Sequence, residues 1–515
     1  MPNDVSPPRK KLLDRFLDGI ERIGNKLPDP AVLFLVMIGL VWLISAVMDG
    51  TAFTLPTKDG PLEKTVISQF TGERLVGFLA DMVPTFTGFH PLGVVLVALM
   101  GVGVAEKAGF IDALLRRLIE ITPSKLLTPA IVFVATISHT ASDAGYVLVI
   151  PLAGAIFHAC GRHPLVGIAA AFAGVSGGFA ANPLPSGTDP LLQGLTQAAV
   201  GILDADRAVN PLCNWFFTAS SSVLVTLVGW FVTERVIEPR IGTTPLDGEA
   251  ASAPAARGDS SLDLRPLRIA ALVAFLGVLA LALVCVPEAS PFRSAKSGAL
   301  TGNDAPLMKA IVPLIALTFL APGIAFGFVS GRFKSHRDVV SAMSKTLGGM
   351  GYYLVMAFCA AQFIKVFNDS QLGALLAVKG AELLRSMNTP TAVTIVAVVL
   401  LTSIVNLFIG SASAKWALLA PILVPMLMQL GISPELTQAT YRVGDSLTNI
   451  VTPLMIYFPL VVTYCQRWVK DTGVGTLTSI MIPYSFTLGL VWTAYLVMWW
   501  SLGLPLGIQG DLSYP

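Results

Sequence analysis

The chain has 515 residues, of which 54% are hydrophobic and only 13% are charged, with a formal net charge of +2. A soluble protein carries about 25% charged residues, so this chain cannot cover a water-facing surface, and we expect most of it to lie in a lipid bilayer. The balance of charge gives no sign of nucleic-acid binding. The five cysteines lie mostly in apolar runs and lack the spacing of a disulfide framework or a metal site.

Apolar stretches long enough to cross a bilayer dominate the chain. A spanning helix needs about 20 apolar residues. The basic, proline-containing segment 1–29 comes first, and we expect it to stay in the cytoplasm uncleaved. The stretches that follow are 30–48, 91–109, 163–200, 212–236, 267–288, 309–330, 347–367, 437–466 and 476–503. The sequence therefore predicts an all-α polytopic membrane protein with nine transmembrane helices.

Two further apolar stretches, 127–158 and 391–430, are each long enough for two short limbs. Polar residues occupy their midpoints: Ser138-His139-Thr140-Ala141-Ser142-Asp143 in the first, and Gly410-Ser411-Ala412-Ser413-Ala414-Lys415 in the second. A polar turn at membrane depth is tolerated only inside protein or against a cavity. We therefore interpret both stretches as re-entrant hairpins, with two ordinary spans each as the alternative.

The spans 163–200 and 437–466 exceed one membrane thickness and contain internal helix breakers. The first holds Asn182-Pro183-Leu184-Pro185-Ser186-Gly187-Thr188-Asp189-Pro190, and the second holds Arg442-Val443-Gly444-Asp445-Ser446-Leu447-Thr448-Asn449 and then Thr452-Pro453. Proline removes a helix hydrogen bond and clashes with the preceding turn. Both spans are thus predicted to be broken helices whose free backbone groups bind ions or polar substrate atoms.

Hairpin and broken helix occur twice, at an offset of 270 positions without a gap. The matched pairs are Tyr146 with Trp416, Pro151 with Pro421, Gly161 with Gly431, Pro164 with Pro434, Gly174 with Gly444, and Pro183 with Pro453. Two homologous broken segments in corresponding positions are the best sequence indicator of a transporter's binding site.

Lysine and arginine are more frequent in alternate loops, which places the N-terminus in the cytoplasm and the C-terminus on the outer side of the membrane. The chain then divides into a first half, 30–236, a polar cytoplasmic linker, 237–266, and a second half, 267–515. The two hairpins enter from opposite sides, so the repeat is inverted. The loop 49–90 suggests no function, and 370–388 resembles an amphipathic interfacial helix.

Ionisable residues deep in lipid are costly and are functional candidates by default. Here they are His139, Asp143, Asp189, Lys415, Arg442 and Asp445. Arg442 precedes Asp445 by three residues, a spacing that predicts an ion pair on one helix face, structural or functional. Asp189 has no basic neighbour in the sequence and is the better candidate for a coupling ion or proton. His139 is read as a buried histidine rather than a proton relay.

Neutral oxygen atoms near the breaks are candidate ligands for Na⁺, a hard cation. Beside Asp189 and Asp445, they come from Asn182 and Asn449, among other side chains, with helix capping as the alternative role. Trp416, with its counterpart Tyr146, is expected to form an aromatic wall against the substrate, with simple packing as the alternative.

These residues resemble the AbgT family of p-aminobenzoyl-glutamate transporters and antimetabolite exporters. The matching runs are Phe86-Thr87-Gly88-Phe89-His90-Pro91-Leu92-Gly93, Gly101-Val102-Gly103-Val104-Ala105-Glu106-Lys107, Gly161-Arg162-His163-Pro164-Leu165, Ala170-Ala171-Phe172-Ala173-Gly174-Val175-Ser176-Gly177-Gly178, Gly410-Ser411-Ala412-Ser413-Ala414-Lys415-Trp416 and Tyr441-Arg442-Val443-Gly444-Asp445-Ser446-Leu447-Thr448-Asn449.

The resemblance implies a homodimer in the bacterial inner membrane, with nine helices and two hairpins per protomer. It implies cation-coupled transport of p-aminobenzoyl-glutamate, or export of p-aminobenzoate and sulfonamide drugs. The functional positions that it carries over are Asp189, Ser413, Trp416, Pro434, Arg442, Asp445 and Pro453. One difference is Lys415, where a relative has glutamine, and a charge there is expected to alter the substrate or the coupling ion.

Two other functions fit parts of the pattern less well. An intramembrane aspartyl protease would pair two aspartates near Gly-x-Gly-Asp, but Arg442 stands where the first glycine belongs. A Na⁺-coupled dicarboxylate carrier would show Ser-Asn-Thr at its hairpin tips, and neither tip does. We therefore predict a transporter and not an enzyme, without a cofactor, that uses Na⁺ or H⁺ to export a small aromatic carboxylate or sulfonamide.

Overall fold

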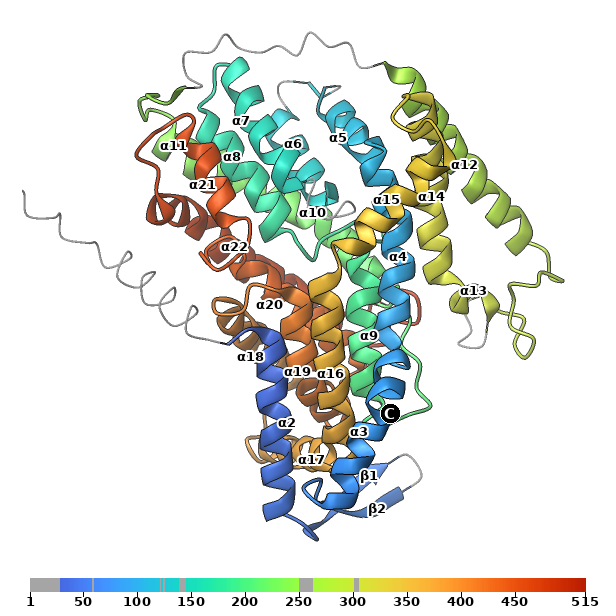
Figure 1. Cartoon of the computed structure of the whole chain (residues 1–515). Helices are drawn as coiled ribbons and strands as arrows, with labels where there is room; N and C mark the ends of the chain where they lie inside the picture. Colours follow the sequence, from blue (N-terminus) through green and yellow to red (C-terminus); the bar gives the residue numbers. More distant parts are fainter. Residues whose placement is uncertain are drawn as a thin grey trace, which may run out of the picture.

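The computed structural model describes residues 28–57, 60–120, 122–123, 126–138, 145–249, 263–300 and 305–515. It is mostly helical, and its helices run chiefly along one long direction (Figure 1). The elements are α2 (Pro30–Val47), β1 (Ala52–Thr57), β2 (Gly60–Thr65), α3 (Gly72–Thr87), α4 (His90–Lys107), α5 (Phe110–Glu120), α6 (Leu127–Ile137), η3 (Gly145–Val149), α7 (Ile150–Ala159), α8 (Pro164–Phe172), η4 (Ala173–Gly177), α9 (Thr188–Val200), α10 (Trp215–Val232), η5 (Thr233–Ile237), α11 (Glu238–Ile241), α12 (Leu264–Cys285), α13 (Pro306–Lys309), α14 (Ile311–Val329), α15 (His336–Gly348), α16 (Gly351–Asp369), α17 (Leu372–Ser386), α18 (Thr391–Asn406), α19 (Ala412–Met428), α20 (Pro434–Thr448), α21 (Phe458–Gln466) and α22 (Val474–Ser501).

Six helices of the described chain are long and apolar enough to cross a membrane: Pro30–Val47, Gly72–Lys107, Trp215–Ile241, Leu264–Cys285, Ile311–Val329 and Val474–Ser501. A seventh candidate is the pair α15 and α16, which is bent by 49°. α12 shows why these helices suit lipid: it is apolar throughout from Ile269 to Cys285, and only three of its side chains are buried. Helices with such exposed apolar faces are unsuited to water.

The broken helices and hairpins appear as pairs of short helices. α8 continues through the π-helical turn η4 and ends before a non-helical segment, after which α9 begins at Thr188. α20 ends at Thr448 and α21 begins at Phe458. α18 and α19 form the second hairpin stretch, while α6 and α7 form the first, whose tip residues 139–144 lie outside the described chain.

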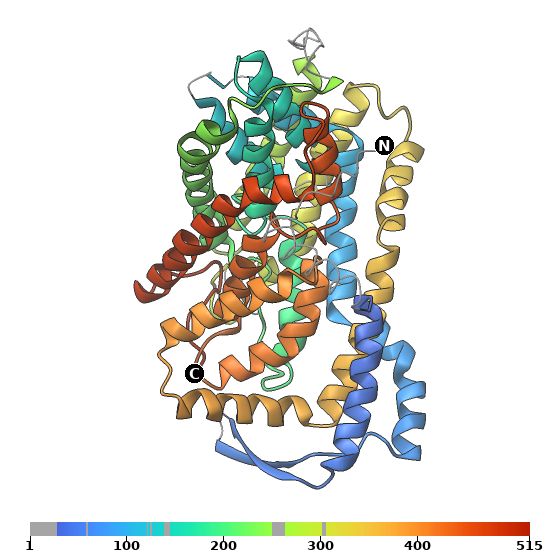
Figure 2. The same ribbon diagram turned by 90° about the vertical axis from the view of Figure 1, so that its left-hand side faces the viewer.

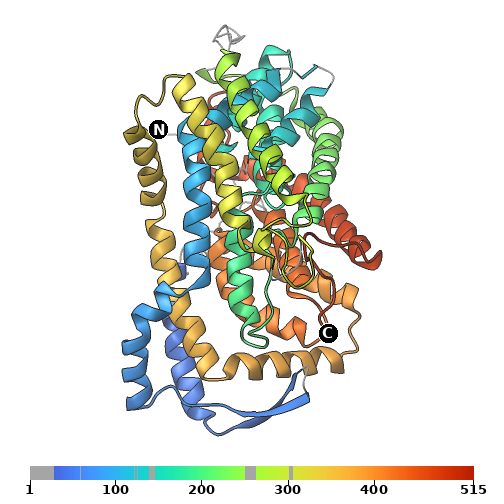
Figure 3. The ribbon, with the colours of Figure 1, turned by 90° about the vertical axis from the view of Figure 1, so that its right-hand side faces the viewer.

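The prediction of an all-helical chain is wrong in the loop 49–90. β1 and β2 form an antiparallel hairpin, in which Ala52 pairs with Thr65 and Thr57 with Gly60. α3 follows and leads through a short break into α4, so the helical part begins well before the predicted span 91–109. The predicted helix at 370–388 is confirmed as α17, which lies across the ends of the bundle beside this hairpin (Figures 2 and 3).

The predicted linker 237–266 is also shorter than expected. α10 continues through η5 and α11 as far as Ile241, and α12 starts at Leu264. Residues 250–262 lie outside the described chain.

Matched glycines let the hairpins pack closely on the broken helices. A Cβ atom on Gly174 would lie 2.5 Å from the Val132 carbonyl oxygen, and one on Gly444 would lie 2.5 Å from the Val399 carbonyl oxygen. Gly174 therefore brings η4 against α6, and Gly444 brings α20 against α18. This is the physical reason for one of the glycine matches that define the sequence repeat.

Alanine at either matched glycine is expected to destabilise the fold. The added methyl group meets backbone atoms in both places, and overpacking of this kind costs about 1–3 kcal/mol. Gly277→Ala in α12 is the control, because nothing lies within 4 Å of the place that its methyl group would take and alanine is the better helix former. Thermal unfolding of the purified variants tests this, and equal midpoints for Gly174→Ala, Gly444→Ala and Gly277→Ala would contradict the packing argument.

Candidate functional site

The two hairpins and the two broken helices meet around a cavity of about 260 Å³. It is lined by Leu99, Val102, Tyr146, Phe179, Gly187, Thr188, Leu191, Gly410, Ala412, Asn449, Met455, Ile456 and Tyr457. These residues come from both hairpins, from both broken helices and from α4. The sequence prediction that the breaks form one site is therefore consistent with the geometry.

Two helices begin at the wall of this cavity. Thr188 is the first residue of α9, and Ala412 is the first residue of α19. The first backbone N–H groups of a helix have no partner within the helix, and the helix dipole adds partial positive charge there. The cavity thus receives two anion-attracting helix ends, one from each half of the chain.

Asp189 joins the two halves through an ion pair with Arg442. The Arg442 Nη1 atom lies 2.7 Å from Asp189 Oδ1, and the two side chains are only 4% and 9% exposed. The other carboxylate oxygen, Oδ2, accepts a hydrogen bond of 2.8 Å from the Ser186 amide, and this bond helps to shape the break before α9. Arg442 Nε has no hydrogen-bond partner among the described residues.

The predicted pairing of Arg442 with Asp445 is wrong, because each finds a partner on another helix. Asp445 Oδ1 lies 2.5 Å from Lys415 Nζ at the start of α19, and the Lys415 side chain is fully buried. Lys415 also donates to Asn406 Oδ1 on α18. Asn406 in turn donates to the Asp445 carbonyl oxygen at 2.7 Å. One buried network therefore fixes both arms of the second hairpin to α20.

Trp416 does not line the cavity. Its ring is fully buried and stacks on Tyr441, with 4.3 Å between ring centroids, and its Nε1 donates to Thr196 Oγ1 at 2.9 Å. Trp416 therefore ties α19 to α20 and α9. The aromatic residues that do line the cavity are Tyr146, the repeat counterpart of Trp416, with Tyr457 and Phe179.

Tyr146 and Tyr457 form a stacked pair, with ring centroids 4.3 Å apart and an angle of 14° between the planes. Tyr146 belongs to the first half of the chain and Tyr457 to the second. The stacked pair therefore joins the two halves, as the Asp189–Arg442 ion pair does. Sequence analysis missed Tyr457 as a wall residue. Its position four residues after Pro453, in the break between α20 and α21, was the available signal.

The other predicted residues take varied positions. Asn449 lines the cavity, whereas Asn182 is buried in the first break outside the cavity lining, and its Oδ1 accepts from the Leu184 amide at 3.1 Å. Ser413 is half-buried in the first turn of α19 and contacts Ser411, with 3.4 Å between the Oγ atoms. Pro453 lies in the second break.

Pro434 lies away from the cavity. It is the first residue of α20 and precedes Arg442 by eight positions, about 12 Å along the helix axis. The sequence candidates His139, Ser142 and Asp143 lie outside the described chain.

Within the described residues, no three or more His, Cys, Asp or Glu side chains gather in a group able to hold a metal ion. Oxygen atoms from other groups are present near the cavity. The Ser176 Oγ atom is buried without a partner in the described chain, and the Ser176 carbonyl oxygen accepts from Asn449 Nδ2 at 3.5 Å. Hydroxyl, amide and carboxylate oxygens of this kind are the ligands that hard cations prefer.

Comparison with known proteins gives consistent matches over nearly the whole chain. The model of the AbgT putative transporter family matches residues 15–514. The p-aminobenzoyl-glutamate transport protein of Escherichia coli strain K12 is 34% identical over 498 residues, which cover 95% of each chain.

Two solved transporter structures share the fold. The YdaH transporter of Alcanivorax borkumensis is 42% identical with a TM-score of 0.87, over 93% of this chain and all of that chain. MtrF of Neisseria gonorrhoeae, described as illuminating a class of antimetabolite efflux pumps, is 42% identical with a TM-score of 0.88, over 94% of this chain and 97% of that chain.

Removing one partner of a buried pair is expected to be more harmful than removing both. Lys415→Met leaves the Asp445 carboxylate buried without its cation, which costs about 3–5 kcal/mol of unfolding free energy. Adding Asp445→Leu removes the bare charge, so the double variant is expected to recover much of the loss. Unfolding of the purified protein, followed by tryptophan fluorescence, measures both.

The matched control is Lys379→Met, which breaks a pair with Glu382 whose side chains are 62% and 54% exposed. Exposed pairs contribute only about 0–1 kcal/mol. If Lys415→Met and Lys379→Met had the same unfolding midpoint, the buried network would not have the stabilising role that its geometry indicates.

Proposed function

Because the chain belongs to the AbgT putative transporter family, we propose that it is a cation-coupled secondary active transporter that exports p-aminobenzoate-type compounds across the bacterial inner membrane. Its substrates would be p-aminobenzoyl-glutamate, p-aminobenzoate and sulfonamide antimetabolites. The compounds named for its relatives support this class. Family membership makes the chain a transporter and not an enzyme. The observation that carries the proposal is the cavity at the four helix breaks, with a buried ion pair across the repeat beside it.

We propose that the chain crosses the membrane nine times and carries two re-entrant hairpins. Six long helices, the bent pair α15 and α16, and the two broken helices together make up the nine crossings. The hairpins α6/α7 and α18/α19 lie toward opposite ends of the molecule (Figure 1), which supports an inverted repeat. In this arrangement the N-terminus is cytoplasmic, the C-terminus is periplasmic, and the protein works as a homodimer, as the family resemblance implies.

The cavity suits an aromatic carboxylate. The carboxylate would face the N-termini of α9 and α19, whose amides favour negative charge. The aromatic ring would lie against the Tyr146 and Tyr457 rings, since aromatic groups gain from stacked or edge contacts. Ser413 and Arg442 supply further donors close by, and Trp416, Pro434 and Pro453 hold the helices that shape the site.

Coupling would depend on Asp189 and Asp445. A coupling cation would be held by carboxylate and amide oxygens, and the candidate ligands are Asp189, Asp445, Asn182 and Asn449. The electrochemical gradient of that cation would then drive transport. In the described conformation the two aspartates are neutralised by Arg442 and Lys415. Any change in charge at either aspartate therefore alters a contact between helices of the site, which links charge to conformation.

Flux of radiolabelled p-aminobenzoate in proteoliposomes tests the function, with Na⁺ and pH gradients imposed separately. We expect one gradient to drive flux, and we expect Asp189→Ala and Asp445→Ala to abolish it, because each removes a buried charge next to the cavity. Asp206→Ala, at an exposed position, is the control. Normal flux in folded Asp189→Ala and Asp445→Ala proteins would show that these aspartates do not carry coupling.

Substitution of the tyrosine wall is expected to weaken substrate binding without unfolding the chain. Tyr457→Leu removes an aromatic contact worth about 0.5–1.5 kcal/mol, which corresponds to a roughly two- to tenfold higher KM for p-aminobenzoate. Tyr457→Phe keeps the ring and should stay near the wild type. If Tyr457→Leu and Tyr457→Phe had the same KM, the aromatic ring of the substrate would not bind against Tyr457.

A further inference from the structure

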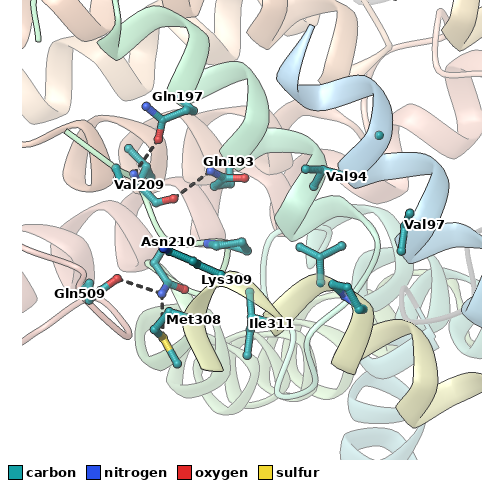
Figure 4. A pocket seen from close by; sticks show the side chains of 15 residues that line it. Val94, Val97, Gln193, Gln197, Val209, Asn210, Met308, Lys309, Ile311 and Gln509 are labelled. Atoms are coloured by element: carbon teal, nitrogen blue, oxygen red, sulfur yellow. Dashed lines mark hydrogen bonds between the residues drawn. The ribbon is translucent and has the colours of Figure 1, made fainter. Parts of the chain in front are cut away.

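A second cavity of about 380 Å³, larger than the cavity at the helix breaks, is lined by the same two helices, α4 and α9 (Figure 4). α4 contributes Val94 and Val97 to its wall, and α9 contributes Gln193 and Gln197. Its volume falls within the range of about 300–1,000 Å³ that is usual for small-molecule sites.

The two cavities are consecutive along one seam between α4 and α9. The wall passes from Val97 to Leu99 on α4 and from Gln193 to Leu191 on α9, about 3 Å along each helix axis. Leu99 lines the first cavity and packs against the break before α9, because a Cβ atom on Gly187 would lie 2.8 Å from Leu99 Cδ2.

Gln193 presents an unused hydrogen-bond acceptor to the second cavity. The residue is 2% exposed, and its Nε2 donates to the Val209 carbonyl oxygen at 2.8 Å. Its Oε1 has no partner among the described residues. Figure 4 shows this oxygen on the side of the carboxamide that faces Val94. A buried acceptor without a donor costs free energy, and a ligand with an N–H group would satisfy it.

The neighbouring loop holds its shape without a ligand. Gln197 Oε1 accepts from the Val209 amide at 2.7 Å, and Gln197 Nε2 donates to the Arg207 carbonyl oxygen at 2.8 Å. Asn210 Nδ2 donates to Gln509 Oε1 at 3.0 Å. These groups serve the protein itself, so Gln193 Oε1 is the unpaired acceptor among these side chains.

The remaining walls define the chemistry of that ligand. Val94, Val97, Ile311 and Val312 are apolar, and among the described residues of the lining only Lys309, exposed at the end of α13, carries a charge. A flat apolar body would fit between the α4 and α14 side chains, and a negative group would lie near the Lys309 ammonium.

We propose that this cavity is an outer binding site for an amino-substituted aromatic carboxylate on its way to or from the cavity at the helix breaks. The amino group donates to Gln193 Oε1, the ring packs against the valines of α4, and the carboxylate pairs with Lys309. This inference rests on the proposed function, because it takes the transported compound as the ligand. In the proposed topology this site faces the periplasm.

Equilibrium binding of radiolabelled p-aminobenzoate to the purified full-length protein in lipid nanodiscs tests the inference, together with transport KM and maximal rate in proteoliposomes. The wild type is expected to bind two molecules per chain. Gln193→Leu and Lys309→Gln are each expected to bind one, and to raise the KM for substrate on the periplasmic side about five- to tenfold while the maximal rate stays unchanged. Asp189→Ala is expected to lose transport and to keep outer binding.

Two controls separate the ligand contacts from other effects. Gln197→Leu removes loop contacts like those lost in Gln193→Leu but no free acceptor, so equal losses in both would overturn the role of Gln193. Lys296→Gln removes an exposed charge outside the cavity lining and should match the wild type.

The outcomes also separate this inference from the proposed function. One bound molecule per wild-type chain, or wild-type affinity in Gln193→Leu and Lys309→Gln, overturns the outer site while transport by the wild type still supports the function. Neither binding nor flux of p-aminobenzoate by the folded wild type overturns both.

Discussion

The site depends on one constraint: a charge buried among membrane helices needs a partner within reach. Asp189 and Asp445 satisfy it through Arg442 and Lys415, with distances of 2.7 and 2.5 Å. Neither pair lies within one helix. Asp189–Arg442 joins the first broken helix to the second, and Lys415–Asp445 joins the second hairpin to the second broken helix. Since a bare buried charge costs several kcal/mol, separating these segments requires that something else neutralise each aspartate. Movement and charge are thereby linked.

The helix breaks are useful because the surrounding packing is tight. Gly174 and Gly444 allow helices to approach so closely that a methyl group would meet a carbonyl oxygen, and Trp416 is fully enclosed between Tyr441 and its neighbours. Rigid short helices on either side of a break hold their exposed ends in place. The ends of α9 and α19 can therefore face the same cavity from opposite halves of the chain.

Sequence patterns located the breaks but not the contacts between them. Proline and glycine act on their own turn of helix, so the interruptions near Pro183 and Pro453 could be predicted locally. The partner of Arg442 could not, because Asp189 lies 253 positions away. The spacing to Asp445 suggested the wrong pair, since a long arginine side chain reaches a neighbouring helix as easily as its own next turn. The expectation for Trp416 failed for a similar reason: Trp416 and its repeat counterpart Tyr146 are both buried, and packing decides that only Tyr146 lines the cavity. The strands at 52–65 were missed because only β1 alternates, with Phe53 and Leu55 buried between exposed neighbours, whereas β2 shows no two-residue pattern.

The charge arrangement also suits the release of the anionic substrate that we propose. If Arg442 and Lys415 were unpaired, an aromatic carboxylate would meet two full positive charges in a low dielectric and would leave slowly. Each cation is already matched by an aspartate, so the attraction that remains comes mainly from two helix N-termini, each equivalent to about half a charge. A transported substrate must bind well enough to enter the site and weakly enough to leave it. The proposed outer site next along α4 and α9, with Lys309 in its lining, would continue that balance by offering the departing anion another modest attraction instead of a single deep one.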